Sequence, residues 1–169
     1  MRLLYEFDAG DYAGLTRRSV RSAVRSIIFR DGRIAMVFSP KEGYYKFPGG
    51  GVEEHESHAQ ALVRETAEET GLTVVPSSIR EFGKIHEIRR STHFEDEIFD
   101  HTSYYYRAQV EEGVARQRLD PYEAELGFQL AYVEPRQAYD TNRVKGRQYR
   151  SSFILREAKV LELLLAETK

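Results

Sequence analysis

The sequence predicts an α+β fold in which a mixed β-sheet lies between helices. Stretches with the patterns of strands come in two groups, one before residue 50 and one after residue 70. Helical patterns lie between these groups and at the C-terminal end, and this order suits a sheet packed between helices. The chain has 169 residues, enough to bury a core without disulfides, so we expect a single domain over residues 1–169.

The first group of strands shows apolar side chains alternating with polar ones, or short extended segments rich in aromatic residues. Asp31 and Gly32 form a two-residue hairpin signal between two of these strands. The last segment runs into Pro48 and three glycines, whose backbone can pass close to a ligand or a helix end. The expected strands are residues 3–7, 19–29, 33–38 and 44–47.

The clearest helix covers residues 57–70. Ser57 has the side chain of a helix N-cap, and Gly71 supplies a C-terminal stop. Ala61 and Leu62 are among the apolar positions of this helix.

The second half of the chain continues with strands and ends in helices. An acidic loop containing Glu95, Asp96, Glu97 and Asp100 separates the two longest strands. Pro135 opens a short helix, and the chain ends in a long amphipathic one. The expected strands are residues 72–75, 79–88, 102–110 and 126–133, and the expected helices are residues 136–139 and 151–167.

Three glutamates in the first helix stand out. Glu65, Glu68 and Glu69 have the i, i+3, i+4 spacing that places three carboxylates on one helical face. Because like charges at this spacing destabilise a helix, the cluster favours a bound cation that neutralises it. Carboxylate oxygens are ligands for hard cations, so the pattern points to Mg²⁺, with Mn²⁺ as a second candidate.

The segment around these glutamates resembles the Nudix box, Gly-x5-Glu-x7-Arg-Glu-U-x-Glu-Glu-x-Gly-U, where U is aliphatic. Thr66 stands where the family prefers an aliphatic residue, and His55 stands where a glycine commonly precedes the first glutamate. The positions that match the box are Gly50, Glu56, Arg64, Glu65, Glu68, Glu69, Gly71 and Leu72.

The resemblance implies an α/β/α sandwich and a Mg²⁺-dependent pyrophosphohydrolase, which is an acid anhydride hydrolase. Such an enzyme cleaves the pyrophosphate linkage of a nucleoside diphosphate joined to a group X. A nucleoside triphosphate, an oxidised nucleotide and a nucleotide sugar all fit this description as substrates.

The resemblance also implies roles for the residues of the box. Glu65, Glu68 and Glu69 would be catalytic and hold the metal, and Glu56 would support the loop or an outer metal position. Arg64 would hold a carboxylate of the box through a bidentate pair, and Gly50 and Gly51 would lie near the substrate.

Residues outside the box leave alternatives open. A further glutamate often acts as base in this family, and the candidates are Glu95, Glu97, Glu123 and Glu125. Arg21 and Arg25 lie four apart, so they share one face of a strand, where they either meet phosphates or form its exposed side. Further basic residues that could approach a pyrophosphate are Arg17, Arg18, Arg89, Arg90 and His93.

Composition excludes several classes of function. The chain has no cysteine, which excludes disulfides, zinc–thiolate sites and cysteine nucleophiles. A formal net charge of −2 gives no pull toward extended nucleic acid, and no segment has the length of a membrane span. We therefore expect a cytoplasmic protein with a small nucleotide as substrate, and the sequence leaves a homodimer open.

Two other functions compete with this interpretation. A Nudix-like fold could bind a nucleotide for regulation without turnover, but the intact set of mutually repelling glutamates argues against it. An enzyme that processes the 5′ end of RNA would act on capped or triphosphorylated RNA, which the near-neutral charge does not favour.

Overall fold

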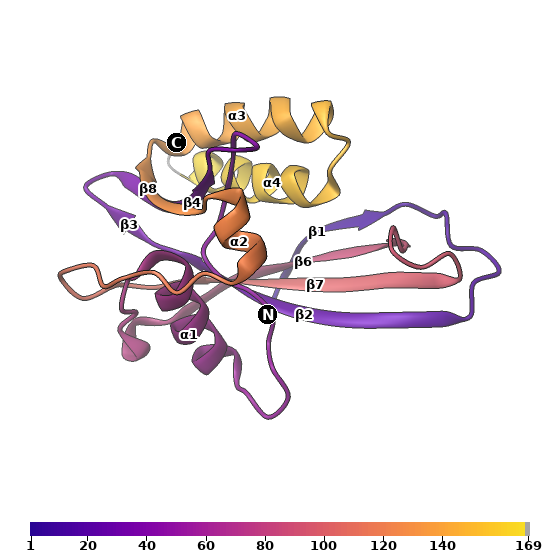
Figure 1. Ribbon diagram of the computed structural model, residues 1–169, viewed down its shortest axis with the longest axis horizontal. Coiled ribbons are helices and arrows are strands. Elements are labelled where there is room, and N and C mark those ends of the chain that lie inside the picture. The colour runs from indigo at the N-terminus through magenta and orange to yellow at the C-terminus, as the bar shows by residue number, and fades with distance from the viewer. Residues whose placement is uncertain (168–169) are drawn as a thin grey trace.

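Two β-sheets form the centre of the computed structural model, which describes residues 1–167 (Figure 1). The first sheet has the strand order β1-β6-β7-β2. β1 runs parallel to β6 and β2 runs parallel to β7, whereas β6 and β7 are antiparallel, so this sheet is mixed. Its strands are β1 (Leu3–Asp8), β2 (Arg17–Ile27), β6 (Arg80–Arg90) and β7 (Glu97–Arg107).

The second sheet is antiparallel and is built around β4. β4 pairs with β8 along one edge and with β3 and β5 along the other. Asp31 and Gly32 turn the chain between β3 and β4 with φ of 51° and 77°, as the hairpin signal predicts. Its strands are β3 (Phe29–Arg30), β4 (Arg33–Ser39), β5 (Tyr44–Lys46) and β8 (Gln129–Val133).

Helices cover the sheets from both sides, with α3 and α4 on one side and α1 on the other (Figure 1). Val24 of β2 packs against Leu62 of α1, and Tyr105 of β7 packs in the cluster that contains Leu161 of α4. This layering confirms the predicted α+β sandwich. No helix within residues 1–167 is long and apolar enough to cross a bilayer. The helices are α1 (His58–Thr70), α2 (Pro121–Leu126), α3 (Pro135–Gln148), α4 (Ser152–Glu167) and the short 3₁₀ turn η1 (Pro76–Ser78).

Helix α1 has the ends that the sequence predicts. The Ser57 side chain accepts from the backbone of Gln60, and the Gln60 side chain accepts from the backbone of Ser57, which completes a capping box. Gly71 ends the helix in the left-handed conformation with φ of 75°.

The structure corrects three expected elements. Residues 72–75 make one isolated bridge, between Val74 and Val110, and no strand. The strand expected over residues 126–133 begins only at Gln129, because Asp120 and Glu123 make a capping box and Pro121 opens a helix, α2, that includes Leu126. Helix α3 continues to Gln148, well past the expected end at residue 139, and Asn142 in its middle bonds to the backbone of Tyr45.

The expected acidic loop is in part a strand. Glu97 and Asp100 belong to β7, where they lie beside β2 and pair with arginines from that strand. Arg17 contacts Glu97 at 3.7 Å, and Arg18 contacts Asp100 at 3.1 Å. Cross-strand charge pairing therefore accounts for the acidic residues that the sequence assigns to a loop.

Replacing His86 by glutamine is expected to remove a pH-dependent part of the stability. His86 of β6 contacts Glu6 of β1 and Asp100 of β7 at 2.8 Å each. Hydrogen bonding to Glu6 raises the pKa of His86 above its usual value. Its contribution to stability is therefore complete below about pH 6.5 and is lost as the pH rises through the raised pKa.

Urea unfolding of both proteins at pH 6 and pH 9 tests this. We expect the wild type to exceed the H86Q variant at pH 6 by about 0.5–1 kcal/mol, and the difference to vanish at pH 9. A difference that is the same at both pH values would contradict the assignment.

Candidate active site

The glycine segment, residues 48–52 before α1, runs alongside β2 and continues the mixed sheet at its edge. The backbone of Val24 donates to Gly50 at 2.9 Å, and that of Ser26 donates to Pro48 at 2.8 Å. Val52 in turn donates to Ser22 at 3.0 Å. The segment is thus fixed between β2 and the helix that follows it.

Two of its glycines are required by their surroundings. Gly49 has φ of 136°, and a Cβ there would lie 2.1 Å from the Val24 carbonyl oxygen. A Cβ on Gly50 would lie 2.2 Å from Oε2 of Glu65. Gly51, in contrast, has nothing within 4 Å of its Cβ position. The backbone can therefore approach β2 at Gly49 and the Glu65 carboxylate at Gly50 only because side chains are absent.

Arg64 joins three carboxylates of the box. Its Nε and Nη2 atoms donate to the two oxygens of Glu56 at 2.9 and 2.8 Å, which is a bidentate pair. Its Nη1 donates to Glu65 at 2.6 Å and contacts Glu68 at 3.4 Å. Since both Glu56 oxygens are bonded to Arg64, the structure places Glu56 as a support of Arg64, and its metal role stays a prediction.

The three glutamates on the face of α1 differ in burial. Glu65 is largely buried, and this burial raises the pKa of its carboxyl group. The Glu68 side chain is 32% exposed and has a second arginine, Arg118, at 3.7 Å. Glu69 is only 1% exposed.

Glu69 has a cationic partner, Lys46, that no sequence motif indicates. The Lys46 ammonium group at the end of β5 forms an ion pair with Oε1 of Glu69, and Lys46 is itself buried. Oε2 of Glu69 accepts from the Gly49 backbone at 2.8 Å. Glu69 therefore connects β5 and the glycine segment to helix α1.

Of the four glutamates considered as a base, the structure brings Glu123 to the box. Burial, followed by hydrogen bonding with Glu69, raises the pKa of Glu123 to about 7. Glu125 lies on the outside of α2, where its exposed carboxylate contacts Lys41 at 2.6 Å.

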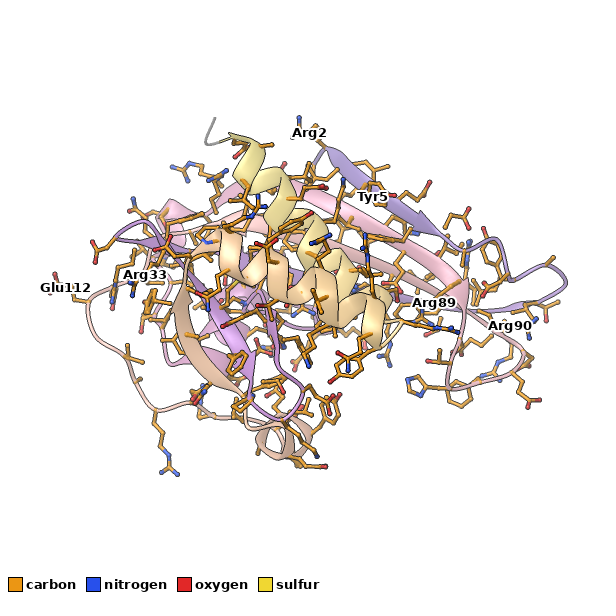
Figure 2. All side chains as sticks on the ribbon, turned by 90° about the horizontal axis from the view of Figure 1, so that it is seen from above. Arg2, Tyr5, Arg33, Arg89, Arg90 and Glu112 are labelled. Atoms are coloured by element: carbon orange, nitrogen blue, oxygen red, sulfur yellow. The ribbon has the colours of Figure 1, made fainter. Side chains whose placement is uncertain are left out.

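The other two candidates lie far from the box. Glu97 pairs in register with Arg17, and Arg17 is seven residues before Val24, the β2 residue that contacts Gly50. At about 3.3 Å per residue, this is about 23 Å along the strand. Glu95 bonds to Arg90 at the same end of the sheet. Arg89 and Arg90 lie at the opposite end of the molecule from Arg33 and Glu112 (Figure 2).

The donor set of the site fits a hard divalent cation by its chemistry. All candidate ligands are carboxylate oxygens, and the Glu69 and Glu123 carboxyl groups lie close enough to share a proton. Within residues 1–167, however, no three acidic or histidine side chains are gathered in a geometry that could hold a metal. Arg64 pairs with Glu65 and Lys46 pairs with Glu69, so two of the candidate ligands also have cationic side-chain partners.

Three buried hydrogen bonds support the site, and they join segments that are distant in the sequence. Thr66, in an aliphatic position of the box, is fully buried and donates to the Ser26 hydroxyl at 3.0 Å. Ser26 donates in turn to the Pro48 carbonyl at 3.1 Å. Glu157 of α4 accepts from the Phe47 backbone at 2.7 Å. Together with Glu69, which accepts from the Gly49 backbone, it provides a second buried carboxylate that anchors the start of the glycine segment.

Replacing His55 by glycine is expected to stabilise the protein. His55 has a positive φ of 67°, which explains why glycine is common at this position of the box. Its side chain is 90% exposed, so little contact is lost. We expect the free energy of unfolding to rise by about 0.5–1 kcal/mol in thermal or urea unfolding. Glu54→Gly is the matched control, and it is expected to lower stability because Glu54 does not have a positive φ.

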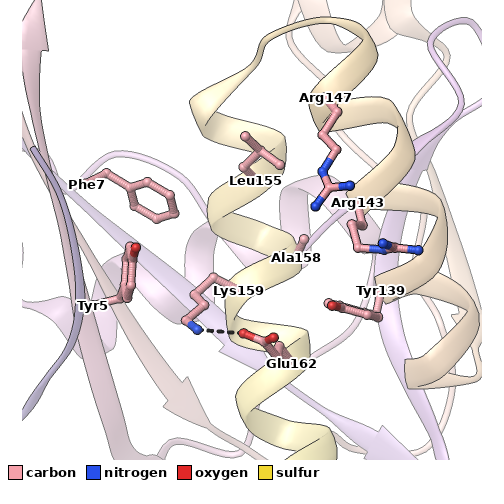
Figure 3. Close-up of a pocket in the computed structure, with 9 residues that line it drawn as sticks. All are labelled: Tyr5, Phe7, Tyr139, Arg143, Arg147, Leu155, Ala158, Lys159 and Glu162. Atoms are coloured by element: carbon pink, nitrogen blue, oxygen red, sulfur yellow. Dashed lines mark hydrogen bonds and ion pairs between the residues drawn. The ribbon is translucent and has the colours of Figure 1, made fainter. Parts of the chain in front are cut away.

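A separate groove lies between β1 and the helices α3 and α4 (Figure 3). Tyr5, Phe7 and Tyr139 line it together with Arg143, and an ion pair between Lys159 and Glu162 at 2.6 Å crosses one side. None of the residues of the box lines this groove.

Comparison with known proteins places the chain in a family. The family model of the NUDIX domain matches residues 20–154. Among curated proteins, CTP pyrophosphohydrolase from Escherichia coli (strain K12) is 47% identical over 53 residues. This alignment covers 29% of the chain and 39% of the relative, so the chain spans about two fifths of that relative's length.

Solved structures show the same fold. A NUDIX hydrolase from Nitrosomonas europaea has a TM-score of 0.57 at 21% identity, covering 82% of this chain and 85% of that one. A MutT NUDIX hydrolase from Burkholderia pseudomallei has a TM-score of 0.51 at 22% identity, covering 70% of this chain and 85% of that one. At these identities the likeness shows the fold alone. Because the NUDIX match extends over most of the chain, the protein belongs to the Nudix family.

Proposed function

We propose that the protein is a Mg²⁺-dependent pyrophosphohydrolase that cleaves a nucleoside diphosphate linked to a group X. The observation that carries this proposal is the close approach of Gly50 to Glu65, which leaves room for backbone and carboxylate but for no side chain. The relative named CTP pyrophosphohydrolase supports a nucleotide as substrate. The predicted cytoplasmic location and the homodimer stay predictions.

The difficulty of the reaction is electrostatic, because water must attack a phosphorus atom that is surrounded by anionic oxygens. When bound, a divalent cation neutralises phosphate charge and lowers the pKa of a bound water. Glu65, Glu68 and Glu69 would hold the cation, and Glu68 is the most accessible of the three. Arg64 keeps Glu65 in place through the 2.6 Å contact.

Glu123 is our candidate for the base that takes a proton from the attacking water. Of the four candidates, it is the one whose pKa is raised by a neighbouring carboxylate of the box, that of Glu69. Helix α2 brings it there, since the Asp120 capping box fixes the start of that helix and includes Glu123 itself.

A substrate panel tests the proposal. Release of phosphate or pyrophosphate is measured with nucleoside triphosphates, oxidised nucleotides, nucleotide sugars and triphosphorylated RNA, each with Mg²⁺, Mn²⁺ or EDTA. We expect metal-dependent turnover of at least one small nucleotide and none in EDTA. Nucleotide binding without turnover of any substrate would favour a regulatory protein, and activity confined to RNA would favour the 5′-end enzyme.

A further inference from the structure

A cleft of about 400 Å³ runs along β2 beside the glycine segment. Its volume lies in the range of pockets that bind small molecules. Arg21, Ala23 and Arg25 line it from β2, His101 lines it from β7, and Gly51 lines it from the glycine segment. Since alternate residues of a strand share a face, the two arginines enter the cleft from the same side of the sheet.

Arg25 is a buried charge without a partner. It is 7% exposed, and its Nε and Nη1 atoms make no hydrogen bond within residues 1–167. His101 is 9% exposed, and its Nδ1 is also unpartnered there, whereas Nε2 contacts the Ser103 hydroxyl. Leaving buried polar groups unpaired is costly, and most of all for a charged one. The interpretation of Arg25 as part of an exposed face is therefore wrong, and the cleft contains donors that lack an acceptor.

The charge around these donors is positive. Burial and the neighbouring cations lower the pKa of His101 to about 2, and the arginines that contribute are Arg156, Arg25, Arg21 and Arg89. Arg89 and Arg156 are matched by Glu87, at 2.8 and 3.2 Å. Arg21 and Arg25 form no ion pair within residues 1–167. The side of β2 that carries them therefore has unneutralised positive charge, in a chain whose net charge is −2.

The cleft adjoins the box at Gly51. Arg25 follows Val24, whose backbone donates to Gly50, and Gly50 contacts Glu65. An anion bound by Arg25 would thus lie at the edge of β2, beside the glycine segment that contacts Glu65.

We propose that Arg21, Arg25 and His101 form a subsite for a phosphate group of the substrate that is additional to the two phosphates of the cleaved linkage. This inference rests on the proposed function and narrows its substrate class. A guanidinium group presents paired donors to phosphate oxygens, and neutral imidazole adds a further hydrogen bond. Nucleoside triphosphates, or an X that is itself phosphorylated, are then preferred over nucleotides in which X is an uncharged sugar.

Binding of inorganic tripolyphosphate in EDTA tests the subsite without metal and without turnover. We expect the NMR signals of His101 to shift on titration while those of the exposed His55 stay unchanged. The R25Q variant should bind tripolyphosphate about 10- to 100-fold more weakly, since charge-assisted hydrogen bonds are lost. R143Q is the matched control, because Arg143 is an exposed arginine in the separate groove (Figure 3).

Stability and turnover complete the test. R25Q should unfold at the same or a higher temperature than the wild type, because it removes an unpaired buried charge. With Mg²⁺, R25Q should raise KM for a nucleoside triphosphate about tenfold or more and leave KM for a nucleotide sugar unchanged. The subsite proposal is contradicted if R25Q binds tripolyphosphate as tightly as the wild type does, or if R143Q weakens binding as much as R25Q does. Binding with the expected R25Q effect but no hydrolysis of any nucleotide would instead refute the proposed function alone.

Discussion

The E68Q variant is expected to lose turnover by about 10²–10³-fold while remaining folded. Glutamine keeps the shape of the side chain but removes the negative charge that a divalent cation requires. Glu68 is the best of the three glutamates for this test, because its side chain is 32% exposed and its contacts with Arg64 and Arg118 are 3.4 and 3.7 Å. Such exposed contacts contribute little to stability, so the unfolding free energy should change by less than about 1 kcal/mol.

Turnover is measured as phosphate or pyrophosphate release over a range of Mg²⁺ concentrations, and binding of Mg²⁺ is followed by calorimetry. E54Q is the control, since Glu54 carries an 89% exposed carboxylate whose contact is with the neighbouring His55. It should retain the turnover and the metal dependence of the wild type. If E68Q retains both as well, Glu68 is not a ligand and the assignment of the metal to this face of α1 fails.

The sequence predicts best what local spacing determines. The ends of α1, from the Ser57 cap to Gly71, follow from short-range patterns, and the structure confirms both. The bidentate pair between Arg64 and Glu56 also joins residues within one motif. Helix α2 is not among the predicted elements, although Asp120, Pro121 and Gly127 are local signals for the two ends of a helix. The apolar residues that follow favour a strand instead.

What the sequence could not predict depends on contacts between distant segments. Lys46 and Glu69 are 23 residues apart, and Phe47 and Glu157 are 110 apart. In the sequence Arg25 is one of several arginines in an amphipathic strand. Only the packed structure shows that it is buried and that its Nε and Nη1 atoms are unpaired within residues 1–167. The sequence cannot choose among the four candidate bases for the same reason. The structure separates them, because strand register places Glu97 far from Val24 and α2 brings Glu123 to Glu69.

The K46M variant is expected to lower the free energy of unfolding by about 3–5 kcal/mol in the absence of metal. Lys46 and Glu69 form a buried ion pair in which the side chains are 9% and 1% exposed. Methionine retains much of the apolar stem that packs near Phe128 but leaves the Glu69 carboxylate without its cation. That carboxylate also lies beside Glu123, so the loss adds repulsion to the cost of burying a charge.

Urea unfolding in EDTA measures this change, with K41M as the matched control. Lys41 pairs with Glu125 at the surface, where the side chains are 49% and 69% exposed, so K41M should cost less than about 1 kcal/mol. The double variant K46M/E69Q should recover part of the stability, because it removes the unpaired charge together with its partner. If K46M is as stable as K41M, the buried pair does not hold β5 to α1. A double variant less stable than K46M would show that Glu69 acts chiefly through the Gly49 backbone, to which it is bonded at 2.8 Å.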